Sequence, residues 1–151
     1  MEATFKILET SRNIYLKFLE GYTLEQLNKI PEGFSNNLIW NIGHIVVSQQ
    51  GLIYRLSGLP VNVSDEMHEK YKNGSRPDGK ATQEEVDEIK HLLIALAKQT
   101  KADFEAGKFQ HYTEYQTKTG FHLANFKDAM EFSNYHEGIH LGMMMNIRKF
   151  L

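Results

Sequence analysis

Apolar residues recur at helical spacing along most of this chain. Positions three and four residues apart share one face of a helix, so this pattern predicts amphipathic helices. No segment shows the alternation typical of a half-buried strand. A short helical turn is expected over residues 23–28. Four long helices are expected over residues 3–20, 35–57, 82–106 and 125–149.

Residues at the helix ends support these boundaries. Ser35 or Asn36 is a suitable N-cap for the second long helix, and Gly58 is a suitable stop. Thr82 with Glu85 three residues later is typical of a capping box at the start of the third. Together these signals predict an all-α fold in a single domain covering residues 1–151.

Two long connections separate the predicted helices. Residues 59–81 are polar and too numerous for a tight turn, so we expect them to cross the length of a bundle. Residues 108–123 carry Tyr112, Tyr115 and Thr119, which are suited to orienting a small polar substrate. We expect part of this second connection to cover one end of a site.

The second long helix has almost no polar face over residues 38–47. A helix that is apolar all round is normally buried all round. This pattern leaves two alternatives, a central position in the domain or a subunit interface. We favour the interface, and hence a homodimer, because symmetric dimers are the commonest oligomers.

Composition and charge exclude several classes of function. The 151 residues include no cysteine, which removes disulfides, thiolate ligands and a cysteine nucleophile. A net charge of -2 gives no electrostatic reason to expect nucleic acid or an anionic membrane as a partner. The longest apolar stretch is too short to span a bilayer, and no signal peptide is recognisable at the N-terminus. We therefore expect a cytoplasmic protein.

Histidines provide the strongest chemical signal. His136 and His140 are four residues apart in the last helix, which places both imidazoles on one face. His44 lies inside the apolar second helix. One histidine on an apolar face is usually a hydrogen-bonded core residue, but three on inward faces favour a shared metal ion. The other histidines lie in loop or mixed surroundings and are expected to be solvated; they are His68, His91, His111 and His122.

The string His136-Glu137-Gly138-Ile139-His140 also matches the zincin protease signature, in which the glutamate is a general base. Zincins take a third ligand downstream, and the sequence after His140 contains no His, Asp or Glu. The third ligand is therefore expected upstream, at His44. For Glu137 we expect a supporting or packing role rather than that of general base.

The stretch Leu38-Ile39-Trp40-Asn41-Ile42-Gly43-His44-Ile45, together with the final His-x-x-x-His helix, resembles the DinB-like superfamily. The resemblance spans nearly the whole chain. It implies a four-helix bundle with a long crossover between the second and third helices, usually dimeric. It also implies a divalent metal bound by three histidines, which here are His44, His136 and His140.

Relatives in that superfamily include bacillithiol- and mycothiol-dependent S-transferases and a maleylpyruvate isomerase. The resemblance therefore implies metal-dependent chemistry on a small molecule, with a low-molecular-weight thiol as the first candidate substrate. Metal-dependent hydrolysis and metal or ligand binding without turnover are the alternatives. Zinc or nickel is the expected metal, although imidazole also suits iron and copper. The pattern identifies no catalytic residue.

Three further residues carry weaker expectations. Trp40 lies one turn before His44, and core packing is favoured over a role in lining a pocket. Gly138 and Gly142 are unfavourable in a helix interior, so their spacing suggests close approach of another helix.

Overall fold

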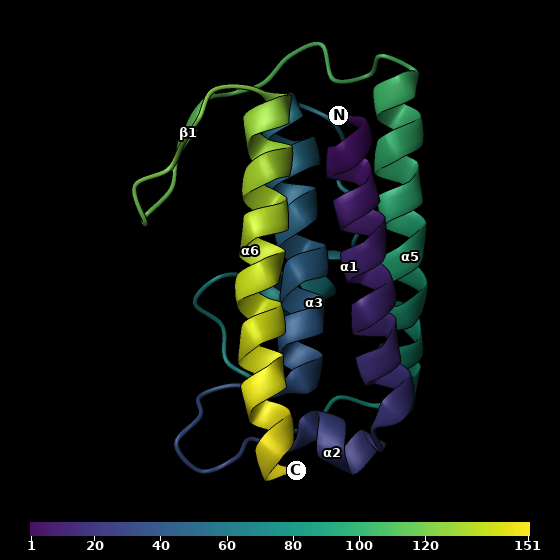
Figure 1. The fold of residues 1–151 in the computed structure, drawn as a ribbon, viewed down its shortest axis with the longest axis vertical. Coiled ribbons are helices and arrows are strands. Elements are labelled where there is room, and N and C mark those ends of the chain that lie inside the picture. Colours follow the sequence, from purple (N-terminus) through teal and green to yellow (C-terminus); the bar gives the residue numbers. More distant parts are fainter.

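Four long helices run side by side in the computed structural model, which describes residues 1–151 (Figure 1). They are α1 (Glu2–Gly21), α3 (Leu38–Gln49), α5 (Gln83–Glu105) and α6 (Phe126–Ile147). The predicted all-α fold is thereby confirmed. In Figure 1, α1 and α6 run one way along the bundle and α3 and α5 run the other way. The segment between α3 and α5 therefore returns along the bundle.

The central position of α3 explains its apolar composition. Every residue from Leu38 to Val47 is buried within this single chain. The expectation that this helix forms a subunit interface is therefore wrong, because α1, α4, α5 and α6 already cover it. The N-cap is Asn37, whose side chain accepts a hydrogen bond from the amide of Trp40, and not Ser35 or Asn36.

The end of the second predicted helix is less regular than its start. After Gln49 it continues as a π-helical turn, η1 (Gln50–Tyr54), and a 3-10 turn, η2 (Arg55–Ser57). Gly58 then adopts a φ of 71°, which ends the helix where predicted. π-Helical turns inside helices are frequent at functional sites.

Five shorter elements complete the fold. The predicted turn over residues 23–28 is confirmed as α2 (Leu24–Asn28). The connection between α3 and α5 contains a helix that the sequence pattern did not predict, α4 (Asp65–Tyr71). The connection before α6 contains an antiparallel hairpin, β1 (Tyr115–Gln116) and β2 (His122–Leu123), and a 3-10 turn, η3 (Arg148–Phe150), follows α6. No helix is both long enough and apolar enough to cross a membrane.

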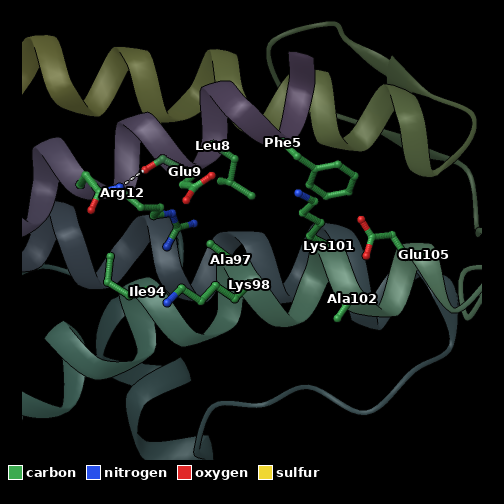
Figure 2. Close-up of a pocket in the computed structure, with 11 residues that line it drawn as sticks. Phe5, Leu8, Glu9, Arg12, Ile94, Ala97, Lys98, Lys101, Ala102 and Glu105 are labelled. Carbon is green, nitrogen blue, oxygen red and sulfur yellow. Dashed lines mark hydrogen bonds between the residues drawn. The ribbon is translucent and has the colours of Figure 1, made fainter. Parts of the chain in front are cut away.

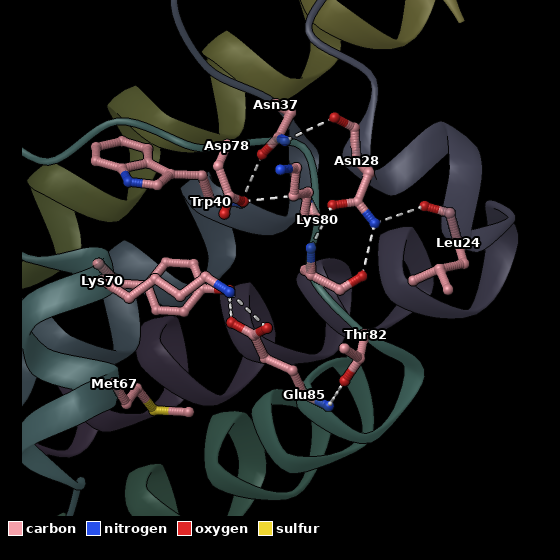
Figure 3. Close-up of polar contacts among 12 residues, drawn as sticks. Leu24, Asn28, Asn37, Trp40, Met67, Lys70, Asp78, Lys80, Thr82 and Glu85 are labelled. Carbon is pink, nitrogen blue, oxygen red and sulfur yellow. Dashed lines mark hydrogen bonds and ion pairs between the residues drawn. The ribbon is translucent and has the colours of Figure 1, made fainter.

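Polar contacts join α2, α3, α5 and the connection between them at one end of the bundle (Figure 3). The Asn28 side chain donates to the Ala81 carbonyl and accepts from the Ala81 amide, both at 2.8 Å. Thr82 caps α5 as predicted, but Glu85 does not complete the capping box. The Glu85 carboxylate instead accepts hydrogen bonds from Lys70 at 2.7 Å and from Tyr71 at 2.5 Å. These contacts hold α4 against the start of α5.

Gly43 permits the close approach of α4 to α3. A Cβ atom at this position would lie 2.5 Å from the ring of Tyr71, which is almost fully buried. We expect Gly43→Ala to lower the free energy of unfolding by about 1–3 kcal/mol, because the ring has no free space to enter. Gly138→Ala is the matched control. No atom lies within 4 Å of a Cβ at this position, so alanine should be neutral or should stabilise the helix. Urea denaturation of both variants tests this, and equal stabilities would contradict it.

Candidate metal centre

Three histidines from two helices meet on one side of the bundle. α3 contributes His44, and α6 contributes His136 and His140. The Nε2 atom of His136 lies 3.4 Å from that of His44 and 3.2 Å from that of His140. One nitrogen from each ring lies within 4.8 Å of the other two, as ligands of one ion must. The predicted convergence of the three rings is confirmed.

Hydrogen bonds at the far side of two rings orient them toward this point. Nδ1 of His44 lies 2.7 Å from the Tyr71 carbonyl oxygen, to which its proton is donated. Nδ1 of His140 donates in the same way to Oδ1 of Asn41 at 2.7 Å. Asn41 is oriented by its own donation to the Asn37 carbonyl at 2.7 Å. With Nδ1 protonated, both Nε2 atoms carry a free lone pair.

These lone pairs fit a cation. The two Nε2 lone pairs of His44 and His140 both face Nε2 of His136. A single proton on His136 can be donated to only one of them, and Ser48 Oγ, 3.2 Å from Nε2 of His44, is the only other donor nearby. A metal ion would accept a lone pair from all three nitrogens. Such outer hydrogen bonds to carbonyl groups are typical of metal-ligating histidines.

Burial keeps all three histidines neutral, which is the form that binds metal. Removal from water disfavours the charged imidazolium and lowers the pKa of His44. The same cause, reinforced by the neighbouring histidines, lowers the pKa of His136 to about 4 and that of His140 to about 3. The site is therefore ready to accept a cation at neutral pH.

Acid should destabilise the metal-free protein. The unfolded chain takes up protons near pH 6.5, whereas folded His136 takes one up only near pH 4. Stability is therefore full above pH 6.5 and falls as the pH drops toward the folded-state pKa values. We expect a loss of unfolding free energy on the order of 1–2 kcal/mol for each of His136 and His140 between about pH 7 and pH 5, measured by urea denaturation in chelator. The double variant H136Q/H140Q should lose less stability over this pH range. If its stability depends on pH as steeply as that of the wild type, the buried histidines are not the cause.

Trp40 supports the site from behind. Its ring stacks on His44 with centroids 4.8 Å apart and planes at 10°, and its indole nitrogen donates to Ser75 at 3.0 Å. It is buried and does not line the adjoining pocket, so the predicted core position is confirmed.

Glu137 faces away from the histidines, into the centre of the bundle. Its Oε1 accepts hydrogen bonds from Arg12 at 2.6 and 3.1 Å, and both side chains are 1% exposed. Burial raises the pKa of Glu137, and the Arg12 guanidinium opposes that rise. Gln49 also accepts from Arg12, at 3.3 Å. The predicted supporting role of Glu137 thus takes the form of an ion pair between α6 and α1.

A pocket of about 530 Å³ adjoins two of the three histidines, His44 and His136. Ser48, Gly51 and Arg55 line it from successive turns of the helix that carries His44. Apolar and aromatic side chains form much of the remaining wall; they are Val47, Leu52, Leu56, Tyr115, Phe132, Tyr135 and Ile139. A volume of this size suits a small organic molecule.

Residues 108–123 cover this pocket, but not with all of the side chains that were predicted. Tyr115 and Thr119 line it, but Tyr112 does not. Tyr112 instead packs against the hydrophobic cluster beneath the other end of the connection. His68, expected to be solvated, is half-buried and lines the pocket from α4. The sequence pattern missed it because α4 itself was not predicted.

Gly138 and Gly142 do not serve close helix packing within the chain. Nothing lies within 4 Å of a Cβ built at either position. The expectation of a neighbouring helix at this face is therefore wrong for the single chain. The helix α1 contacts α6 through Arg12 and Tyr15, on another side.

A second groove, of about 420 Å³, lies between α1 and α5 (Figure 2). Its lining includes the apolar residues Phe5 and Leu8 and the charged residues Lys98, Lys101 and Glu105. No histidine lines it. It is therefore separate from the candidate metal centre.

Comparison with known proteins agrees with this architecture. The sequence profile of the DinB superfamily matches residues 7–144, which include the whole of α3 and α5, most of α1 and α6, and the three histidines. No curated protein matches the sequence. Because this match covers most of the sequence, we conclude that the chain belongs to the DinB superfamily.

Proposed function

We propose that this protein is a metal-dependent enzyme that acts on a small molecule, with transfer of a thiol as its reaction class. The observation that supports this most is the position of the three histidines beside the 530 Å³ pocket. The group consists of His44, His136 and His140, and no carboxylate joins it. Three protein ligands with a position left for substrate are typical of catalytic rather than structural sites.

Thiol transfer is favoured over hydrolysis by the position of Glu137. Hydrolytic sites commonly use a carboxylate beside the metal as general base, and the adjacent Glu137 is bound to Arg12 in the core. A divalent cation held by the three imidazoles would stabilise a substrate thiol as its thiolate. The chain has no cysteine, so the sulfur must arrive with the substrate.

Within this proposal, different residues of the chain orient the histidines, exclude water and line the approach to the metal. The carbonyl of Tyr71 and the amide of Asn41 hold two imidazoles in the tautomer that presents Nε2. The stacked ring of Trp40 shields His44 from water. Apolar side chains such as Val47 and Phe132 line the approach and limit the water around a bound sulfur.

Cobalt substitution tests the proposal. Untagged protein is stripped with chelator, loaded with one equivalent of cobalt and titrated with 2-mercaptoethanol at up to millimolar concentration. A sulfur–cobalt charge-transfer band is expected, and it should be absent from the H136A/H140A variant. An unchanged spectrum would remove the basis for thiol transfer and favour hydrolysis or simple metal binding.

We also propose that the chain forms a homodimer. Large apolar side chains are exposed on α1 and α6, namely Ile7, Ile14, Ile139, Met143 and Met145, and the two helix glycines lie among them on α6. Light scattering of the untagged protein gives the mass directly, and a mass near the monomer's 17.5 kDa would exclude the dimer.

A further inference from the structure

The pocket beside the histidines is positively charged. Arg55, Lys72 and Lys118 line it, and none of its lining residues is Asp or Glu. The chain as a whole carries a net charge of -2, so this excess of cations is local. Basic groups gathered in a pocket raise the local concentration of anions.

Two of these cations have no partner within the protein. Arg55 and Lys118 are exposed and take part in no ion pair or side-chain hydrogen bond. Lys72 differs, because it is paired with Glu69 at 2.5 Å. Arg55 and Lys118 are therefore free to bind an anion.

Arg55 and the histidines occupy different parts of the pocket, whereas Lys72 directly follows Tyr71, whose carbonyl oxygen accepts from His44. Arg55 follows His44 by eleven residues on the same helix, which corresponds to roughly 15 Å along the axis. Between them lie Ser48 and Gly51, with the π-helical turn η1. Lys118 reaches the same pocket from the hairpin. Apolar side chains also line the pocket over this stretch of the helix.

We propose that the substrate is an elongated organic anion. A carboxylate or phosphate at one end binds Arg55 and Lys118, and an apolar middle packs against residues such as Leu52 and Phe132. The opposite end presents the reactive group to the three histidines. This inference rests on the proposed function for the identity of that reactive group, but the anion preference stands on the charges alone.

A pair of thiols that differ only at the far end tests the proposal. Titration of the cobalt protein with 6-mercaptohexanoate and with 6-mercaptohexanol gives two dissociation constants from the charge-transfer band. We expect the carboxylate to bind roughly tenfold more tightly, because a charge-assisted hydrogen bond is formed only with it. A third arm, 6-mercaptohexylphosphonate, distinguishes phosphate from carboxylate preference. Equal affinities for the charged and neutral thiols would overturn the proposal.

Matched variants assign the preference to the two residues. In the variant R55Q/K118Q, the ratio of the dissociation constants of 6-mercaptohexanol and 6-mercaptohexanoate should fall to near one. The binding of 6-mercaptohexanol itself should not weaken. The control K98Q/R148Q removes one lysine and one arginine outside this pocket. Lys98 lines the groove between α1 and α5 (Figure 2), and Arg148 follows α6. This control should keep the tenfold difference between the two thiols. A ratio that survives in R55Q/K118Q would contradict the assignment.

A separate measurement keeps the two proposals distinct. If no thiol changes the cobalt spectrum, thiol transfer fails, and hexanoate and hexanol are compared by amide chemical shifts on the metal-free protein. Shifts around Arg55 and Lys118 with hexanoate alone would support the anion site even then. No difference between the two molecules would exclude it.

Discussion

Replacing His136 and His140 together with alanine is expected to abolish the binding of one divalent ion per chain. Only His44 would remain of the three nitrogens that lie within 4.8 Å of one another. A single imidazole cannot hold the ion against water and chelator. Elemental analysis of untagged protein, stripped and then reloaded with zinc or nickel, measures the loss.

The same variant should stay folded. Most helix stability comes from packed apolar faces, and α6 keeps Ala129, Met130 and Met144 in the core. Circular dichroism checks this, with H91A/H111A as a control that removes two exposed histidines. Metal retained at wild-type stoichiometry would refute the assignment. Unfolding would indicate a structural metal instead.

Asn41→Ala provides a milder test of the same centre. Without its Oδ1 atom, His140 loses the acceptor that fixes its tautomer. Loss of such an outer partner typically lowers metal affinity about 10–100-fold. Competition with a chromogenic chelator measures the change, and an unaltered affinity would show that Asn41 does not orient the ring.

The second large effect concerns the ion pair in the core. Glu137→Leu should lower the free energy of unfolding by about 3–5 kcal/mol, because it leaves the Arg12 guanidinium buried without a counter-charge. Arg12 is 1% exposed and its Nη1 already has no partner. Glu69→Gln is the control: its pair with Lys72 is similarly short but solvent-exposed, so no measurable change in stability is expected.

A double-mutant cycle separates the ion pair from packing. R12M/E137L replaces both charges with apolar groups of similar size, so its loss should be much smaller than the sum of the single losses. Urea denaturation at neutral pH gives all four stabilities. Additive losses would show that the two residues do not interact energetically. Metal binding should survive in the double variant, since the Glu137 carboxylate faces Arg12 and not the point where the three histidines converge.

The sequence alone determined the four long helices and which three histidines come together. Helical spacing of apolar residues persists over long segments, and caps such as Asn125 and Thr82 mark their starts locally. The pairing of His136 with His140 is local too, because four residues complete about one turn. His44 was found because a histidine inside an apolar helix is conspicuous.

Contacts between distant segments were decided only by the tertiary structure. The Tyr71 carbonyl that orients His44 belongs to α4, whose seven residues carry too short a pattern to be recognised. Arg12 and Glu137 are 125 positions apart, and no local rule pairs them. The burial of α3 within one chain likewise depended on how four helices pack around it. Periodicity shows which face of a helix is apolar, whereas the partner that covers that face is determined by the assembled bundle.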